Sequence, residues 1–114
     1  MENLQSALDS AFHALADPTR RAVIGRLVAG PAPVKELAEP FGMGLPAFLK
    51  HLRVLEAGGF IATSKRGRVR TCRLQPQRLS EAEAWLAGQR ALWQASADRL
   101  AAYVETEMAK DDDE

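Results

Sequence analysis

Cysteine is almost absent from this sequence, which has a single thiol at Cys72. One cysteine cannot form an intramolecular disulfide, so we expect a cytoplasmic protein in which this thiol serves as a small packing residue. Histidine is also scarce, and His13 and His51 lie far apart in the sequence. Zinc sites need cysteine or histidine ligands at set spacings. The sequence therefore predicts neither a metal site nor a cofactor.

Long apolar segments are missing as well. No run approaches the roughly 20 apolar residues that a membrane span needs, and residues 1–4 lack the basic and apolar regions of a signal peptide. We therefore expect no contact with a membrane. No glycine-rich phosphate loop and no set of nucleophile, base and orienting group occurs at a useful spacing, which argues against an enzyme.

Net charge is zero, but the charged residues are distributed unevenly. Residues 20–78 contain twelve lysines and arginines against three acidic residues, whereas residues 1–19 and 79–114 have net charges of −3 and −6. A basic segment between acidic ends indicates a local positive surface, as nucleic-acid-binding proteins have. The alternative is a solvated basic face without a partner.

Apolar spacing predicts two helices at the start of the chain. Residues 4–16 carry apolar side chains at helical intervals. Asp17 followed by Pro18 is typical of an N-cap and the first residue of a second helix. We expect that helix to end at Gly30-Pro31.

The sequence predicts two further helices in the first half of the chain. A short one is expected over residues 34–39 and a longer one over residues 45–57, whose apolar side chains form one stripe comprising Leu45, Phe48, Leu52 and Leu55. Gly58-Gly59 followed by Phe60 is typical of a glycine C-cap with its apolar contact.

The periodicity then changes to that of strands. Residues 61–64 and 69–74 are rich in β-branched side chains, and residues 65–68 between them predict a turn, so this segment is expected to form a β-hairpin. The Ser-x-x-Glu pattern at residues 80–83 predicts a capping box and a last helix from Ser80 to about Met108. Residues 1–108 are thus expected to form one domain, followed by an acidic, disordered tail over residues 109–114.

The last helix would be too long for a domain of this size to cover its apolar stripe. Such a stripe needs a partner, most simply the same helix of a second subunit, so we expect a homodimer. An alternative is that Trp85, Trp93 and Tyr103 line a pocket for a small-molecule inducer. The residues predicted at the dimer interface are Leu4, Leu8, Phe12, Leu86, Trp93, Leu100 and Tyr103.

Four helices, a hairpin and a long helix define an α+β, mainly helical chain with the pattern of a winged helix-turn-helix. Its parts are a two-stranded β-hairpin wing and a long C-terminal dimerisation helix. In this fold the second helix of the helix-turn-helix enters the major groove of duplex DNA, while a basic hairpin suits phosphates or the minor groove. The residues predicted to bind DNA are Pro46, Ala47, Lys50, His51, Arg53, Lys65, Arg66, Arg68 and Arg70.

Several runs resemble the ArsR-type (ArsR/SmtB) winged-helix repressors. They are residues 12–21, which include Asp17-Pro18-Thr19-Arg20-Arg21, together with residues 36–41, 45–47, 50–56 and 59–61. The resemblance covers about residues 8–105. It implies a homodimeric repressor that pairs through its first and last helices, binds a palindromic operator and leaves it when an inducer acts.

Some family features are absent. The third helix has no Cys-x-Cys, and the last helix has no histidine, so we place the chain among members that lack metal-site residues. Gly44 stands where a serine or threonine is usual, and Leu49 stands where a small polar residue is usual. We expect a repressor or autorepressor of transcription. The alternative is a winged-helix protein-interaction module that no longer binds DNA.

Overall fold

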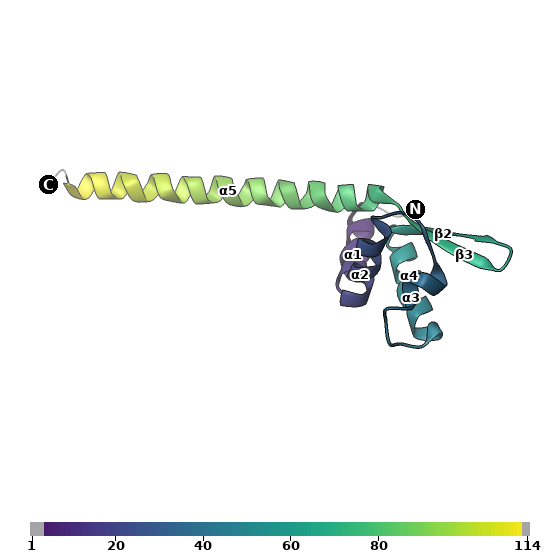
Figure 1. Ribbon diagram of the computed structural model, residues 1–114. Helices are drawn as coiled ribbons and strands as arrows, with labels where there is room; N and C mark the ends of the chain where they lie inside the picture. Colours follow the sequence, from purple (N-terminus) through teal and green to yellow (C-terminus); the bar gives the residue numbers. More distant parts are fainter. Residues whose placement is uncertain (1–3, 113–114) are drawn as a thin grey trace. The chain divides into compact units, whose positions relative to one another are not determined.

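The computed structural model describes residues 4–112, with the side chains of residues 5–111. Figure 1 shows the order of the elements. They are α1 (Leu4–Leu15), α2 (Pro18–Leu27), β1 (Ala32–Pro33), α3 (Val34–Ala38), α4 (Leu45–Ala57), β2 (Ile61–Arg66), β3 (Val69–Leu74) and α5 (Pro76–Asp112). The chain divides into two compact units after Ala82. This order confirms the predicted mainly helical winged fold with a hairpin wing and a long C-terminal helix.

The start of α2 is fixed by the residues that predict it. Asp17 has an extended backbone, and its carboxylate accepts the backbone N–H of Arg20 at 3.0 Å. Pro18 occupies the first turn, where its missing N–H costs no intrahelical bond. The N-cap is confirmed, and the direction in which α2 leaves α1 follows from it.

Helix α4 has the predicted bounds but buries only part of the predicted stripe. Phe48, Leu52 and Leu55 are buried, whereas Leu45 is 49% exposed. Leu45 is exposed because this residue begins the helix, beyond the packed core, and lines a surface groove. Phe48 also stacks on Phe41, with ring centroids 5.6 Å apart.

The end of α4 has the hydrogen bonds of a Schellman motif. Phe60 N–H donates to the Leu55 carbonyl, and Gly59 N–H donates to the Glu56 carbonyl, both at 3.0 Å. Gly59 has a φ of +82°, a left-handed conformation that residues with a Cβ rarely adopt. The motif delivers Phe60 into the core and starts β2.

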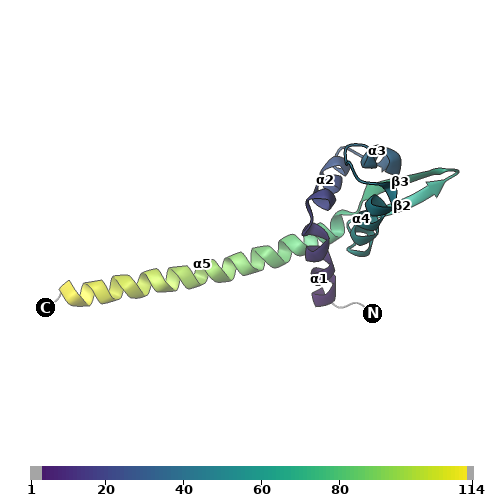
Figure 2. The same cartoon turned by 90° about the horizontal axis from the view of Figure 1, so that it is seen from below.

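The sheet has three antiparallel strands in the order β1-β3-β2, so it contains one strand more than the predicted hairpin. Strand β2 runs two residues further than predicted, to Arg66. Its turn to β3 therefore consists only of Gly67 and Arg68, with a φ of +62° at Gly67, as a type II′ turn requires of its first central residue. Figures 1 and 2 both show the hairpin extending past α3 and α4.

The core joins all of these elements. Side chains from α1 to α4, β1, β2 and β3 contribute to one cluster, and its largest fully buried members are Phe48, Phe60, Leu55, Ile61, Val23 and Cys72. The cluster lies beneath α4, so the face of α4 that carries Pro46, Ala47, Lys50 and Arg53 is turned to solvent.

Helix α5 begins and ends beyond its predicted bounds. The predicted capping box at Ser80 is wrong, because the Ser80 hydroxyl donates to the Pro76 carbonyl one turn earlier, inside the helix. The helix continues to Asp112, so residues 109–112 are helical. None of the helices within residues 4–112 combines the length and apolar character that crossing a membrane requires.

Candidate nucleic-acid interface

The solvent face of α4 carries the residues expected to meet DNA. Pro46, Ala47, Lys50 and Arg53 are all exposed, as expected for positions opposite the buried stripe. Gly44 is the N-cap and makes no side-chain hydrogen bond. The first backbone N–H groups of α4 therefore have no side-chain cap.

The wing concentrates positive charge. Lys65 and Arg66 lie on β2, Arg68 lies in the turn and Arg70 lies on β3, and all four are exposed. Lys65 pairs directly with Arg70 across the ladder. Like charges at opposite positions destabilise a hairpin, so an anion beside the wing would relieve this repulsion.

Arg70 also joins the wing to α4. Its guanidinium donates to the Thr63 hydroxyl at 3.1 Å, and that hydroxyl donates to the Glu56 carboxylate at 3.3 Å. These residues line a shallow hollow of about 290 Å³ between α4 and the wing. The chain of hydrogen bonds holds Arg70 towards the helix, which sequence reasoning did not anticipate.

A second groove lies where α3, α4 and the start of β3 meet, with a volume of about 480 Å³. Its apolar part includes Val34, Leu45, Leu49 and Val69, and its charged residues are Lys35, Glu36, Arg68 and Arg70. Half-buried Leu49 borders both hollows. Apolar walls beside cations suit van der Waals contact with sugars or thymine methyl groups next to phosphates.

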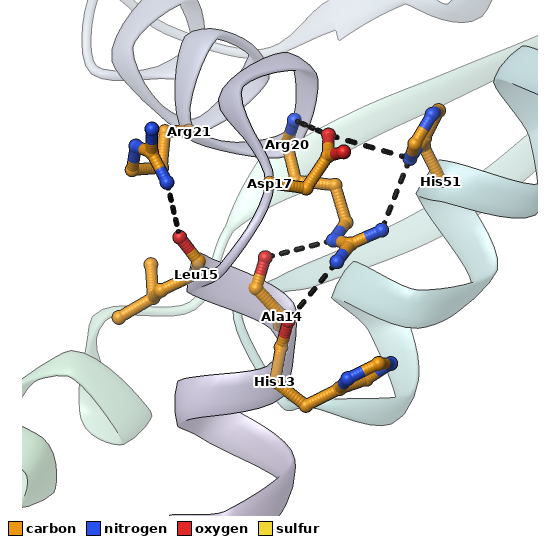
Figure 3. Close-up of polar contacts among 7 residues, drawn as sticks. All are labelled: His13, Ala14, Leu15, Asp17, Arg20, Arg21 and His51. Carbon is orange, nitrogen blue, oxygen red and sulfur yellow. Dashed lines mark hydrogen bonds and ion pairs between the residues drawn. The ribbon is translucent and has the colours of Figure 1, made fainter.

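His51 differs from the other predicted DNA-binding residues because it faces Arg20 and Asp17 (Figure 3). Its Nδ1 atom lies 3.1 Å from Nη1 of Arg20 and 3.6 Å from Oδ2 of Asp17. Only 22% of its side chain is exposed. The helical period places His51 at the border of α4, but it gives no indication of these partners.

Arg20 is the residue that sequence reasoning missed. It is 9% exposed, and its guanidinium donates to the carbonyls of Ala14 at 2.8 Å and His13 at 3.0 Å. Arg21 donates to the Leu15 carbonyl at 2.8 Å. The two arginines thus cap the last carbonyls of α1, where positive charge is favourable. The sequence feature that could have indicated this role is the pair of arginines that directly follows the N-cap of α2.

The same cluster shifts the ionisation of Asp17. The backbone N–H of Arg20, which donates to the carboxylate, lowers the pKa of Asp17, and the charge of His51, when its ring is protonated, and the charge of Arg20 act in the same direction. Desolvation opposes these effects without reversing them. Asp17 is therefore held in the ionised form that caps α2.

The predicted dimer residues fall into two groups. Leu86, Trp93, Leu100 and Tyr103 lie on α5 and are between 51% and 74% exposed. On α1, Leu8 is already buried within the chain and Phe12 is half-buried. The side chain of Leu4 lies outside the described residues. Among the predicted dimer residues whose side chains the structure describes, the exposed ones are therefore all on α5.

The candidates for metal or thiol chemistry are dispersed or buried. Within residues 4–112, no three His, Cys, Asp or Glu side chains gather in a way that could hold a metal ion. Cys72 is fully buried, and its burial raises the pKa of the thiol. His13 is exposed on α1 and is far from Cys72 in the sequence.

Comparison with known proteins shows the family of the chain. A family model described as a helix-turn-helix domain matches residues 15–64. The HTH-type transcriptional regulator Rv2034 of Mycobacterium tuberculosis is 40% identical over 72 residues, which are 63% of this chain and 67% of that protein. The transcriptional repressor SdpR of Bacillus subtilis is 30% identical over 60 residues, or 53% of this chain and 67% of that one.

Solved structures that are similar to this chain also belong to transcriptional regulators. The ArsR family transcriptional regulator RHA00566 is 54% identical, with a TM-score of 0.78 over 82% of this chain and 97% of that chain. The homodimeric winged helix-turn-helix DNA-binding domain of Mb0332 from Mycobacterium bovis is 26% identical, with a TM-score of 0.58 over 83% and 82%. The chain belongs to the ArsR family of winged helix-turn-helix transcriptional regulators. It is therefore a DNA-binding regulator and not an enzyme.

Proposed function

We propose that the protein is a homodimeric repressor, acting in the cytoplasm, that binds a palindromic DNA operator in a sequence-specific manner. The observation that carries this proposal is the exposure of six basic side chains on two adjacent elements, α4 and the wing. They are Lys50, Arg53, Lys65, Arg66, Arg68 and Arg70. The buried face of α4 holds this arrangement rigidly against the core.

The two elements suit different parts of a duplex. Pro46, Ala47 and Lys50 lie in the first half of α4, the part that a helix-turn-helix directs to base edges. Lys50 can reach a guanine or a phosphate, and Arg53, further along the helix, is better placed for a phosphate. The arginines of the wing suit phosphates or a minor groove. Base reading is thus assigned to α4 and sequence-independent affinity to the wing.

Dimerisation is supported by the apolar side chains of α5. Trp93 is 74% exposed in the single chain, and Leu86, Leu92, Leu100 and Tyr103 are more than half exposed. Apolar side chains in such number at a helix surface mark an interaction site. The relative Mb0332 is homodimeric, and a two-fold dimer would match a palindromic operator.

Repression is the simplest outcome of such binding. The described residues form a winged helix-turn-helix and α5, and the occupancy of DNA by these parts is by itself a means of regulation. A dimer seated on a promoter excludes other proteins from it, and the relative SdpR is a transcriptional repressor. Repression of the protein's own gene is the first case to examine.

The test is selection of duplexes from a random library by the immobilised protein, followed by fluorescence anisotropy on the selected sequence. We expect a palindrome whose affinity falls steeply as salt rises, because cations that neutralise phosphates release counterions. Arg66→Ala with Arg68→Ala should weaken binding to selected and scrambled duplexes alike, whereas Lys50→Ala should weaken the selected duplex more. Affinity that is independent of salt would contradict the proposal.

A further inference from the structure

The contact between Arg20 and His51 determines where the imidazole carries its proton. A guanidinium has only hydrogen-bond donors. Because Nη1 of Arg20 lies 3.1 Å from Nδ1 of His51, Nδ1 must supply a lone pair. The proton of the neutral ring must then lie on Nε2. A ring with a proton on Nδ1 would direct it against the guanidinium.

Asp17 does not compete for Nδ1. Its Oδ2 atom is 3.6 Å from Nδ1, which is longer than a hydrogen bond, and the same oxygen accepts the backbone N–H of Arg20 at 3.0 Å. The guanidinium is itself held by the carbonyls of Ala14 and His13. The Arg20 guanidinium is therefore a fixed donor, buried and held by two backbone carbonyls.

The other edge of the ring is directed elsewhere. In Figure 3 the second ring nitrogen of His51 is turned away from Arg20 and Asp17. Among the described residues, the hydrogen bonds and ion pairs of the ring all involve Nδ1. His51 follows exposed Ala47 by one helical turn, so the two side chains are neighbours on α4. Nε2–H thus borders the surface assigned to base reading.

We infer that Arg20 is a positioning residue for DNA recognition and that His51 contacts DNA only as a hydrogen-bond donor, through Nε2–H. This inference rests on the proposed function and assigns the chemistry of one of its contacts. The ligand must be an acceptor on the duplex, either a phosphate oxygen or an acceptor atom in the major groove such as guanine N7 or O6. The amino groups of adenine and cytosine are excluded.

The tautomer can be tested on the free protein. Long-range proton–nitrogen NMR correlations in mildly alkaline buffer should show His51 with a bare Nδ1 and a protonated Nε2. Arg20→Lys keeps the positive charge but has one nitrogen for three acceptors, so the preference for this tautomer should weaken. A wild-type ring protonated at Nδ1 would overturn the inference.

The DNA contact is tested with two amide replacements. Asparagine places its amide near the position of Nδ1 and glutamine places it near that of Nε2, so His51→Asn keeps an acceptor for Arg20 while His51→Gln keeps a donor towards DNA. We expect His51→Asn to lose about tenfold in affinity for the selected duplex, the worth of one hydrogen bond to a charged or base acceptor. His51→Gln should retain more of the affinity. Wild-type affinity in His51→Asn would overturn the inference.

Two controls separate this inference from its foundation. Thermal unfolding of each variant shows whether a loss of binding reflects a loss of fold. If Nε2–H meets a base acceptor, Arg20→Lys should lose affinity for the selected duplex and retain it for scrambled duplexes. If Nε2–H meets a phosphate oxygen, Arg20→Lys should lose affinity for both duplexes at temperatures at which the variant is fully folded. If the wild-type protein binds no duplex, the proposed function fails. If it binds and His51→Asn binds equally well, only the role of His51 fails.

Discussion

Basic residues in the charged middle of this chain serve two different purposes. Arg20 is buried and Arg21 is exposed, yet the guanidinium groups of both donate hydrogen bonds to the carbonyls that end α1. Lys50 and the cations of the wing tip are exposed. Fewer guanidinium groups are therefore free to contact phosphates directly than the composition of residues 20–78 indicates.

Ionised Asp17 contributes stability that depends on pH. The lowered pKa of Asp17 means that this contribution is complete above the ordinary value of 3.8 and is lost as pH falls through the lower folded value. Asp17→Asn keeps an N-cap oxygen without the charge. We expect the wild type to be more stable than this variant at neutral pH and the difference to shrink in acid. Urea unfolding of both proteins between neutral pH and pH of about 3 measures it, and a constant difference would contradict the assignment.

Helix α4 lacks a side-chain cap, and this absence can be repaired. Gly44 has a φ of −66°, and a Cβ built there would meet only Pro46 Cδ at 3.7 Å, so a larger residue fits. Gly44→Ser should stabilise the protein by about 0.5–1 kcal/mol, through a hydroxyl that accepts the Ala47 N–H and through lower entropy of the unfolded chain.

Gly44→Ala separates these two effects, because it shares the entropy effect and provides no cap. Urea unfolding should show the serine variant to be more stable than both the alanine variant and the wild type. A serine variant no more stable than the alanine variant would show that the helix start gains nothing from the hydroxyl.

Elements with signals at both ends are those that the sequence predicts well. Both bounds of α4 are correct because Pro40 and Gly42 interrupt the chain before Leu45 and the Gly58-Gly59 pair follows Ala57. Strand β1 was not predicted, because a strand of two residues, one of them Pro33, is too short to show an alternating pattern. The start of α5 is misplaced because a serine that donates back to Pro76 looks like a cap in sequence.

The candidate interface follows the same logic. Exposure of Lys50, Arg53 and the cations of the wing could be predicted from helical period and turn composition. The partners of His51 could not, because the helical period gives the angle of a side chain and not what it meets. The role of Arg20 could not be predicted, because an arginine that caps carbonyls and one that binds phosphate look the same in the composition.

At the scale of the whole molecule, the apolar side chains of α5 should determine the oligomeric state. Trp93→Glu with Leu100→Glu places charges on exposed positions, so the fold of the single chain should survive while self-association fails. Light scattering after gel filtration should give the mass of one chain, against two for the wild type. Affinity for the selected palindrome should fall as well.

Ala95→Glu supplies the matched control. Position 95 lies about 200° around the helix from Trp93, at 100° per residue, so its charge should leave the dimer intact. If the double variant remains a dimer and Ala95→Glu disrupts it, the interface has been assigned to the wrong side of α5.

Because the turn of the wing has only two residues, the length of β2 and β3 determines how far the cations at its tip lie from the core. Each residue of an antiparallel strand advances about 3.4 Å, which matches the spacing of successive nucleotides along one strand of B-form DNA. Lengthening or trimming the hairpin would thus move its tip in steps of about 3.4 Å along the strand axis. Because side chains alternate between faces, only changes of two residues per strand would keep Arg68 and its neighbours on the same side.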